Sequence, residues 1–181
     1  MGEIELRGTR RIYEGNPILT LEIHDVLLPN GVARKFEVIH HSGASAVVPI
    51  HENGDVVLVH QLRYAADRST LYELPAGKLS PGEAPELCAA RELEEETGLR
   101  AGRLEPLVPI WVTPGFCDER IHLFLARDLV QGERALEEDE IMNTVRLPFD
   151  RALDMIAGGE ITDAKTICGL ACAALRLRAR I

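Results

Sequence analysis

Residues 77–99 read GKLSPGEAPELCAARELEEETGL, and this stretch decides the fold of the chain. A glycine-containing loop leads into residues 84–97, which are rich in alanine, leucine and glutamate. We expect this segment to form a helix that ends at Gly98, because glycine often occupies the position just past the last helical turn. The stretch is therefore predicted to be a loop followed by a helix crowded with carboxylates.

Three glutamates of this helix share one face. At 100° per residue, Glu92, Glu95 and Glu96 fall within an arc of about 100°. The opposite side carries three residues that we expect to face the core: Ala90, Leu93 and Thr97. Like charges at this spacing destabilise a bare helix, but divalent cations between the carboxylates relieve the repulsion, and Mg²⁺ or Mn²⁺ prefers such oxygen ligands. On composition alone, a solvated surface helix is an equal alternative.

The spacing of the fixed positions favours the metal site. Their order is Gly77, five residues, Glu83, seven residues, Arg91-Glu92-Leu93, one residue, Glu95-Glu96, one residue, and Gly98-Leu99. Seven positions that each match at about 7% would coincide by chance at about 10⁻⁸. The pattern resembles the complete signature box of the Nudix hydrolases. That resemblance implies an α/β fold, the Nudix α/β/α sandwich with a mixed sheet, in which the box forms a loop, a helix and a loop.

The resemblance also implies an activity, the hydrolysis of a nucleoside diphosphate linked to another group, with Mg²⁺ or Mn²⁺ as cofactor. It implies these metal ligands: Glu92, Glu96, the backbone carbonyl of Ala76, and Glu95, which assists and also counts among the catalytic residues. Glu83 and Arg91 are expected to pair with each other and shape the loop. A pyrophosphate is polyanionic, so this acidic site would repel it unless cations neutralise the charge of both. The same cations would lower the pKa of the attacking water.

Beyond the box, the chain resembles the ADP-ribose pyrophosphatase subfamily from about residue 35 to its C-terminus. The residues that carry this resemblance are QLRYAADRSTLYELPAGKLSPGE (61–83), the proline sixteen residues past Gly98 (Pro114) and LPFDRALDMIAGGEITDAKTICGL (147–170). The resemblance implies hydrolysis of ADP-ribose to AMP and ribose 5-phosphate. Relatives that cleave ADP- or GDP-sugars, FAD or dinucleoside polyphosphates share parts of these segments, so another nucleotide is the alternative substrate. A non-catalytic nucleotide sensor is a third interpretation, disfavoured by the intact set of carboxylates.

The same resemblance places six residues at the substrate: Phe36, Glu37, Arg63, Glu73, Pro114 and Glu119. Arg63 would bind a phosphate through its guanidinium, with an ordinary surface arginine as the alternative. Phe36 and Glu37 match positions that stack on and hydrogen-bond the adenine, and a core role is equally open for Phe36. Glu73 would line the pocket or structure the box loop. Glu119 would line the pocket or hold its own loop in place.

A second acidic run, EEDE at residues 137–140, would form the mobile loop that carries the catalytic base in this subfamily. Counting back from Pro148 selects Glu140 as that base, with Glu138 as the alternative. A base must come within hydrogen-bond distance of the water, and a loop position allows closure only once substrate is bound. A solvated acidic loop is the other interpretation of this run.

The net charge of the chain is -9, from 29 acidic against 20 basic residues, and residues 73–96 and 133–140 account for all of the imbalance. This excess of acid disfavours binding to nucleic acid, which relies on basic residues facing phosphates. No stretch approaches the ~18 apolar residues of a membrane span, and the start lacks the apolar core of a signal peptide. We therefore expect a cytoplasmic protein without nucleic-acid or membrane partners.

Several strands and two further helices are expected to complete one mixed α/β domain. Strands are predicted at residues 18–28, 32–40, 44–50, 55–62, 103–112, 119–126 and 141–149, with Asn53-Gly54 as a hairpin turn between the third and the fourth. One helix is predicted over residues 150–157, capped by Asp150, and another after the cap Asp163. Residues 1–40 would be a β-rich N-terminal extension and residues 41–181 the Nudix domain. In family members of this type the extension crosses to the partner of a homodimer.

Two other features are not expected to carry chemistry. The four cysteines and six histidines show no metal-ligand spacing along the sequence, so the cysteines are expected to be reduced thiols and each histidine to be structural. GEITDAKT (159–166) nearly matches a phosphate-binding P-loop, but Ala164 stands in place of its second glycine and a helix precedes it. We do not expect this segment to bind a nucleotide phosphate.

Overall fold

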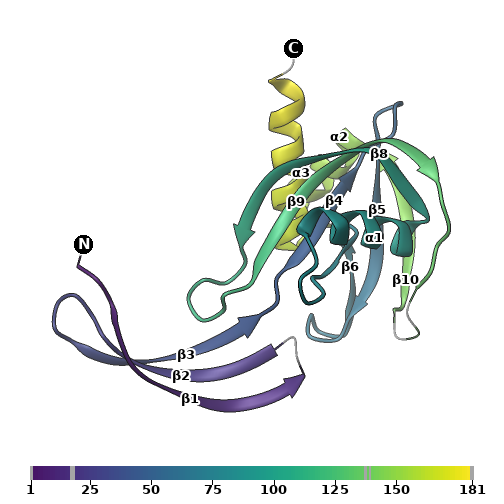
Figure 1. Cartoon of the computed structure of the whole chain (residues 1–181). Helices are drawn as coiled ribbons and strands as arrows, with labels where there is room; N and C mark the ends of the chain where they lie inside the picture. The colour runs from purple at the N-terminus through teal and green to yellow at the C-terminus, as the bar shows by residue number, and fades with distance from the viewer. Residues whose placement is uncertain (1, 17–18, 137, 139, 180–181) are drawn as a thin grey trace. The chain divides into compact units, whose positions relative to one another are not determined.

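Two groups of strands organise the chain, as the computed structural model in Figure 1 shows. The structure describes residues 2–16, 19–136, 138 and 140–179. Its N-terminal unit consists of residues 1–43 and 111–120, and its sandwich unit consists of residues 44–110 and 121–181. The loop at residues 111–120 therefore belongs with the N-terminal strands, although it lies in the middle of the sequence.

The sandwich unit contains two sheets. Its strands are β4 (Ala44–Pro49), β5 (Asp55–Arg63), β6 (Ser69–Glu73), β7 (Ala76–Lys78), β8 (Leu99–Trp111), β9 (Arg120–Gln131) and β10 (Met142–Pro148). One sheet has the order β7-β4-β9-β8 and is mixed, because β4 runs parallel to β9 and antiparallel to β7. The other sheet, in the order β10-β5-β6, is antiparallel.

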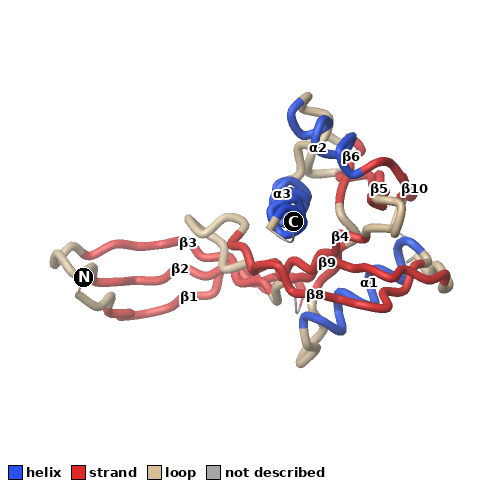
Figure 2. Tube along the Cα trace, turned by 90° about the horizontal axis from the view of Figure 1, so that it is seen from above, coloured by secondary structure: helices blue, strands red, loops and turns tan. Residues whose placement is uncertain are grey.

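Strand β4 contributes to the core on both of its faces. Ala46 and Val48 lie in one apolar cluster with Leu170 of helix α3 (Ala164–Arg178). Val47 points the other way and lies in a second cluster with Leu93 of helix α1 (Pro85–Thr97). Helices therefore cover opposite faces of the mixed sheet, as Figure 2 shows for α1 and α3. The expected α/β/α sandwich is confirmed.

Helix α1 ends as predicted at Gly98, which is left-handed (φ 70°) and donates its N–H to the carbonyl of Glu94. The predicted core face is wrong in one position, because Ala90 is exposed while Leu93 is buried and Thr97 is half-buried. The buried residues of α1 are Cys88, Ala89, Glu92, Leu93 and Glu96. Packing of the small Ala89 side chain against β4 turns this side inward, so two box glutamates are buried rather than solvated.

The other two helices follow the prediction with one correction. Asp163 caps α3, since its carboxylate accepts a hydrogen bond from the backbone N–H of Thr166 (2.9 Å). Helix α2 (Phe149–Ala157) begins one residue earlier than expected, so Asp150 lies within its first turn and is not its cap. The cap position belongs to Pro148, which ends β10. No helix within the described ranges is long and apolar enough to span a membrane.

The Asn53-Gly54 turn forms, with Gly54 at φ 87°, but the hairpin predicted around it is wrong. Strands β4 and β5 belong to different sheets and pair only through an isolated bridge between Ile50 and Val56. Both neighbours of β5 in its sheet are other strands, β6 and β10, and β4 lies between β7 and β9. Long-range pairing has therefore overridden the local turn signal.

The N-terminal unit is an antiparallel sheet with an added loop. Its strands are β1 (Glu5–Asn16), β2 (Leu19–Leu27) and β3 (Ala33–His41), in that order. The loop joins β3 through two backbone hydrogen bonds, from Ile39 N–H to the carbonyl of Phe116 (2.7 Å) and from Asp118 N–H to the carbonyl of Ile39 (3.0 Å). Residues 1–40 are thus β-rich as expected, and their part in a dimer stays a prediction.

Candidate active site

Gly77 and helix α1 bring the box carboxylates together. Gly77 lies so close to Glu92 that a Cβ atom at this position would overlap the Glu92 carboxylate. Glu92 is 8% exposed and Glu96 is 2% exposed, whereas Glu95 is half-buried. A side chain at Gly77 would have to displace the Glu92 carboxylate, so the glycine of the box leaves room for this buried glutamate.

Arg91 is the centre of an ion-pair network on the same helix. Its Nε and Nη2 atoms donate to the two carboxylate oxygens of Glu83 at 3.0 and 3.1 Å. Its Nη1 donates to Glu92 (2.7 Å) and to Glu95 (2.9 Å). The hydrogen bond from Arg91 is the main cause that lowers the pKa of Glu83 to about 2. The expectation that Glu83 and Arg91 pair and shape the loop is confirmed.

Burial makes the inner carboxylates costly as free anions. Desolvation is the main cause that raises the pKa of Glu96 to about 8, and it also raises the pKa of Glu92. One oxygen of Glu96 accepts a hydrogen bond from the backbone N–H of Ala76 (3.1 Å), which fixes this carboxylate beside the β7 segment. Buried carboxylates whose charges repel one another suit a hard divalent cation, because its charge offsets both burial and mutual repulsion. The donor set therefore fits Mg²⁺ or Mn²⁺.

Glu140 lies within electrostatic reach of these carboxylates. Its negative charge is among the causes that raise the pKa of both Glu92 and Glu96. Glu138, the alternative base, is exposed on the same loop, and Glu137 and Asp139 lie outside the described residues. Glu140 thus lies near the carboxylates that are candidates for binding the metal.

Arg63 and Glu73 form a bidentate pair in the sandwich unit. The Nε and Nη2 atoms of Arg63 donate to the two oxygens of Glu73, each at 2.7 Å. Burial by itself would raise the pKa of Glu73, but the hydrogen bond from Arg63 and the charge of Lys165 lower it below the ordinary value. Arg63 also lies near enough to Glu96 for their charges to interact. Glu73 is therefore a structural anchor for Arg63, and contact with substrate stays a prediction for both.

The P-loop-like segment has a structural role. Lys165 contacts the buried carboxylate of Glu73 and also Asp163 (3.0 Å). The hydroxyl of Thr166 accepts a hydrogen bond from the backbone N–H of Leu74 (2.8 Å). These contacts join the start of α3 to Glu73 and Leu74, just before the box. Lys165 and Thr166 therefore both have partners within the fold.

A hollow of about 400 Å³ lies within the N-terminal unit. Its lining includes Phe36 and Glu37 of β3 together with Trp111, Pro114 and Phe116 of the loop. Phe36 is 42% exposed, which excludes the core role that was its alternative. Trp111 and Phe116 are not among the residues predicted for the site, although both lie within three residues of Pro114 and are two of the eight aromatic residues in the chain.

Glu119 contacts its own loop and is not among the residues that line the hollow. Its carbonyl accepts a hydrogen bond from the backbone N–H of Val112 (3.3 Å), which closes the loop at its base. Its carboxylate lies 3.5 Å from Nδ1 of His41. Of the two roles expected for Glu119, these contacts support the second.

Comparison with known proteins gives this geometry a family. The NUDIX domain model matches residues 39–169, which include the whole box and the 137–140 loop. The chain belongs to the Nudix family. The box glutamates of this Nudix protein, the Gly77 loop and the sandwich around them are thus the parts of a known fold.

Two relatives and one solved structure extend this comparison. An ADP-ribose pyrophosphatase of Bacillus subtilis is 42% identical over 158 residues, covering 86% of this chain and 84% of the relative. A methanol dehydrogenase activator of Bacillus methanolicus is 42% identical over 161 residues, covering 88% and 86%. The crystal structure of an ADP compounds hydrolase has a TM-score of 0.86 at 22% identity and covers 99% of this Nudix chain and 97% of its own. That last likeness concerns the fold.

Proposed function

We propose that this Nudix enzyme hydrolyses the pyrophosphate bond of ADP-ribose, giving AMP and ribose 5-phosphate, with Mg²⁺ or Mn²⁺. The observation that carries the proposal is the burial of Glu92 and Glu96 beside Gly77, with the charge of Glu140 near both. The relative named ADP-ribose pyrophosphatase, at 42% identity, supports the choice of substrate.

The metal would be held by these groups: the carboxylates of Glu92, Glu95 and Glu96 and the backbone carbonyl of Ala76. When bound, the metal supplies charge neutralisation for the pyrophosphate and a lowered pKa for the attacking water. Arg91 keeps Glu92 and Glu95 in place through its Nη1 atom. The network of the helix thus sets the ligand geometry before substrate arrives.

Glu140 is the proposed general base, with Glu138 as its alternative. A carboxylate of this loop would accept the proton of the water as the water attacks phosphorus. The interaction of Glu140 with both Glu92 and Glu96 supports the first choice, because the base must work beside the metal ligands. Glu95 would assist at the same site.

Each unit carries residues that are proposed to contact the substrate, Arg63 in the sandwich unit and Phe36 in the N-terminal unit. Arg63, fixed by Glu73, would bind a phosphate oxygen with a guanidinium whose orientation is already set. The adenine would stack on Phe36 in the hollow bounded by Pro114, and Glu37 would accept a hydrogen bond from the exocyclic amine. A flat, mostly apolar base fits a hollow lined by aromatic rings.

Assay of a substrate panel tests this proposal. AMP release from ADP-ribose is compared with turnover of GDP-mannose, FAD and a dinucleoside polyphosphate, each with and without Mg²⁺. We expect Mg²⁺-dependent turnover with the highest kcat/KM for ADP-ribose. A higher value for another nucleotide would assign the enzyme to that substrate, and lack of turnover on the whole panel would leave the sensor interpretation.

We also propose a homodimer formed through the N-terminal sheet. Four apolar side chains at or next to β1 are exposed: Ile4, Leu6, Ile12 and Tyr13. Exposed apolar surface of this kind marks interaction sites. Sedimentation at micromolar concentration tests the proposal: the wild type should sediment as a dimer and a Leu6→Glu/Ile12→Glu variant as a monomer. A monomeric wild type would exclude it.

The proposed location is the cytoplasm. All four cysteines are free, as expected for a protein of a reducing compartment. Fractionation of cells that produce the tagged chain would test this location, with recovery in the soluble cytoplasmic fraction as the expected result.

A further inference from the structure

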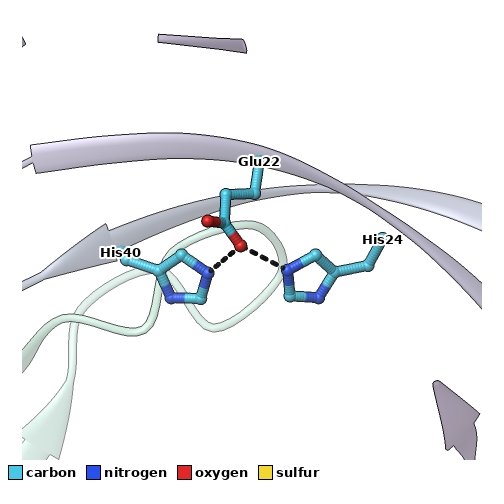
Figure 3. Close-up of side chains that lie close together, drawn as sticks. All are labelled: Glu22, His24 and His40. Atoms are coloured by element: carbon cyan, nitrogen blue, oxygen red, sulfur yellow. Dashed lines mark hydrogen bonds and ion pairs between the residues drawn. The ribbon is translucent and has the colours of Figure 1, made fainter. Parts of the chain in front are cut away.

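Three metal-ligating side chains converge on one face of the N-terminal sheet (Figure 3). Glu22 and His24 are two residues apart on β2, so their side chains share a face. In the β2–β3 register His40 lies opposite Thr20, which puts it on that same face and diagonal to Glu22. One ligand atom from each of the three side chains lies within 4.8 Å of the others.

The spacing of these atoms suits a metal ion. Oε2 of Glu22 is 3.1 Å from Nε2 of His24 and 3.3 Å from Nε2 of His40. Ligand atoms about 2.0–2.1 Å from a tetrahedral Zn²⁺ are about 3.3 Å apart. Two of the three separations therefore already have the value that a shared ion requires.

The hydrogen bond of His40 to Asp118 orients its other ring nitrogen as a ligand. Nδ1 of His40 lies 2.5 Å from Oδ2 of Asp118, and a carboxylate oxygen can only accept. In the neutral ring the proton is thus on Nδ1, so the lone pair of Nε2 faces the carboxylate oxygen of Glu22. Two lone pairs repel at this distance unless a cation lies between them, either a proton or a metal ion.

The surrounding contacts resemble those that support metal ligands in general. A ligating histidine usually gives its second N–H to a carboxylate, which fixes the tautomer and the ring. Asp118 does this for His40 and is itself held by the backbone N–H of His41 (2.8 Å). On the other side, Nε of Arg11 lies 3.3 Å from Oε1 of Glu22, which leaves Oε2 turned to the two histidines.

We propose that Glu22, His24 and His40 form a binding site for a divalent transition metal of the Zn²⁺ type. Two imidazoles and one carboxylate are a ligand set for Zn²⁺ and its neighbours in the transition series, whereas Mg²⁺ prefers oxygen alone. The site shares no residue with the carboxylates of α1 and does not depend on the proposed hydrolase activity. Because one site offers imidazole nitrogens and the other only oxygens, the two sites select different ions.

Such an ion would stiffen the wall of the aromatic hollow. It would join β2 to β3, and His40 would pass the constraint to Asp118, the residue whose backbone N–H donates to Ile39. Ile39 in turn donates to the carbonyl of Phe116, a lining residue of the hollow. The metal would thus fix the loop at residues 111–120 against β3.

Zn²⁺ titration of the metal-free full-length protein tests the proposal, with excess Mg²⁺ present to compete at the α1 carboxylates. Calorimetry should show one Zn²⁺ per chain with wild type and with Glu92→Gln/Glu96→Gln. The affinity should fall beyond detection in His24→Gln and His40→Gln, and by about 10–100-fold in Asp118→Asn.

His60→Gln is the matched control, since His60 is a half-buried histidine of β5 that stacks on Tyr72. It should bind Zn²⁺ as the wild type does. Zn²⁺ should raise the Tm of the wild type and the control but not of His24→Gln, while circular dichroism of the metal-free variants shows that each is folded. Equal Zn²⁺ affinity in wild type and in the two histidine variants would overturn the proposal, and so would a Zn²⁺ signal that disappears in Glu92→Gln/Glu96→Gln.

Discussion

The carboxylate of Glu92 fills the space that any side chain at Gly77 would need: a Cβ atom there would lie 1.8 Å from Oε1 of Glu92. The glycine and the glutamate are fifteen positions apart in the sequence, and the turn into α1 puts them in contact. The box spacing is therefore a packing requirement as well as a chemical one.

Gly77→Ala should lower activity, because the added methyl group displaces Glu92 from the other carboxylates. A shift of about 1 Å at a catalytic group can cost roughly 100-fold in rate, and we expect a loss of that order in kcat. Steady-state kinetics at saturating Mg²⁺ measure it. Gly8→Ala is the control, since its Cβ would meet its nearest neighbour at an ordinary 3.8 Å. Equal kcat in the two variants would contradict the packing argument.

Glu83→Gln should lower the free energy of unfolding at neutral pH and leave it unchanged in strong acid. Arg91 lowers the pKa of Glu83 from 4.5 to about 2 in the folded chain, so the ionised pair stabilises the protein above pH 4.5. That stability is lost as the pH falls from 4.5 to about 2, where the carboxylate takes up a proton. We expect the free energy of unfolding of the variant to be about 1 kcal/mol lower than that of the wild type at neutral pH.

Urea unfolding of the wild type and of Glu83→Gln, from neutral pH down to pH 2, measures this difference. Glu52→Gln is the control, because Glu52 is exposed in the turn before β5. A deficit that stays constant across this pH range would show that the pair with Arg91 is not its cause.

Features that depend on a few neighbouring residues could be predicted from the sequence. The end of α1 at Gly98 and the cap of α3 at Asp163 each need only one helical turn of context, and both are as expected. The pairing of Glu83 with Arg91 also lies within the box. Local backbone geometry and short-range hydrogen bonds decide these features, so their signals are readable in the sequence.

Features that depend on distant partners could not be predicted. The turn at Asn53 does not make a hairpin because β4 pairs with β9 and β5 pairs with β10, and both of these strands lie much farther along the chain. The exposed position of Ala90 follows from how α1 packs on β4, which the helical period alone does not fix. His24 and His40 are sixteen residues apart and meet only through the register of β2 and β3, so their spacing in the sequence carries no signal.

Lys165→Met should destabilise the protein, although the segment around Lys165 resembles a nucleotide site. Glu73 is 1% exposed and is balanced by Arg63 and Lys165, so the variant leaves a buried carboxylate with one cation fewer. Hydrogen bonds to charged groups contribute roughly 2 kcal/mol, and we expect a loss of that size in urea unfolding. Lys78→Met, at an exposed position, is the control. A variant as stable as the wild type would remove the structural role of Lys165.

Glu140→Gln should abolish most of the turnover while leaving the fold and the metal site in place. Glutamine keeps the shape of the side chain but cannot accept the proton of the attacking water, and general-base catalysis contributes about 10²–10⁴-fold. Glu138→Gln is the matched control on the same loop, and its kcat should change by less than about threefold, within the context-dependence of a single exposed charge.

Steady-state kinetics with ADP-ribose at saturating Mg²⁺ measure both variants. The loss should appear in kcat with little change in KM, because the base acts in the transition state and not in binding. A fully active Glu140→Gln beside an inactive Glu138→Gln would transfer the role of base to Glu138, and full activity in both would place the base outside this loop.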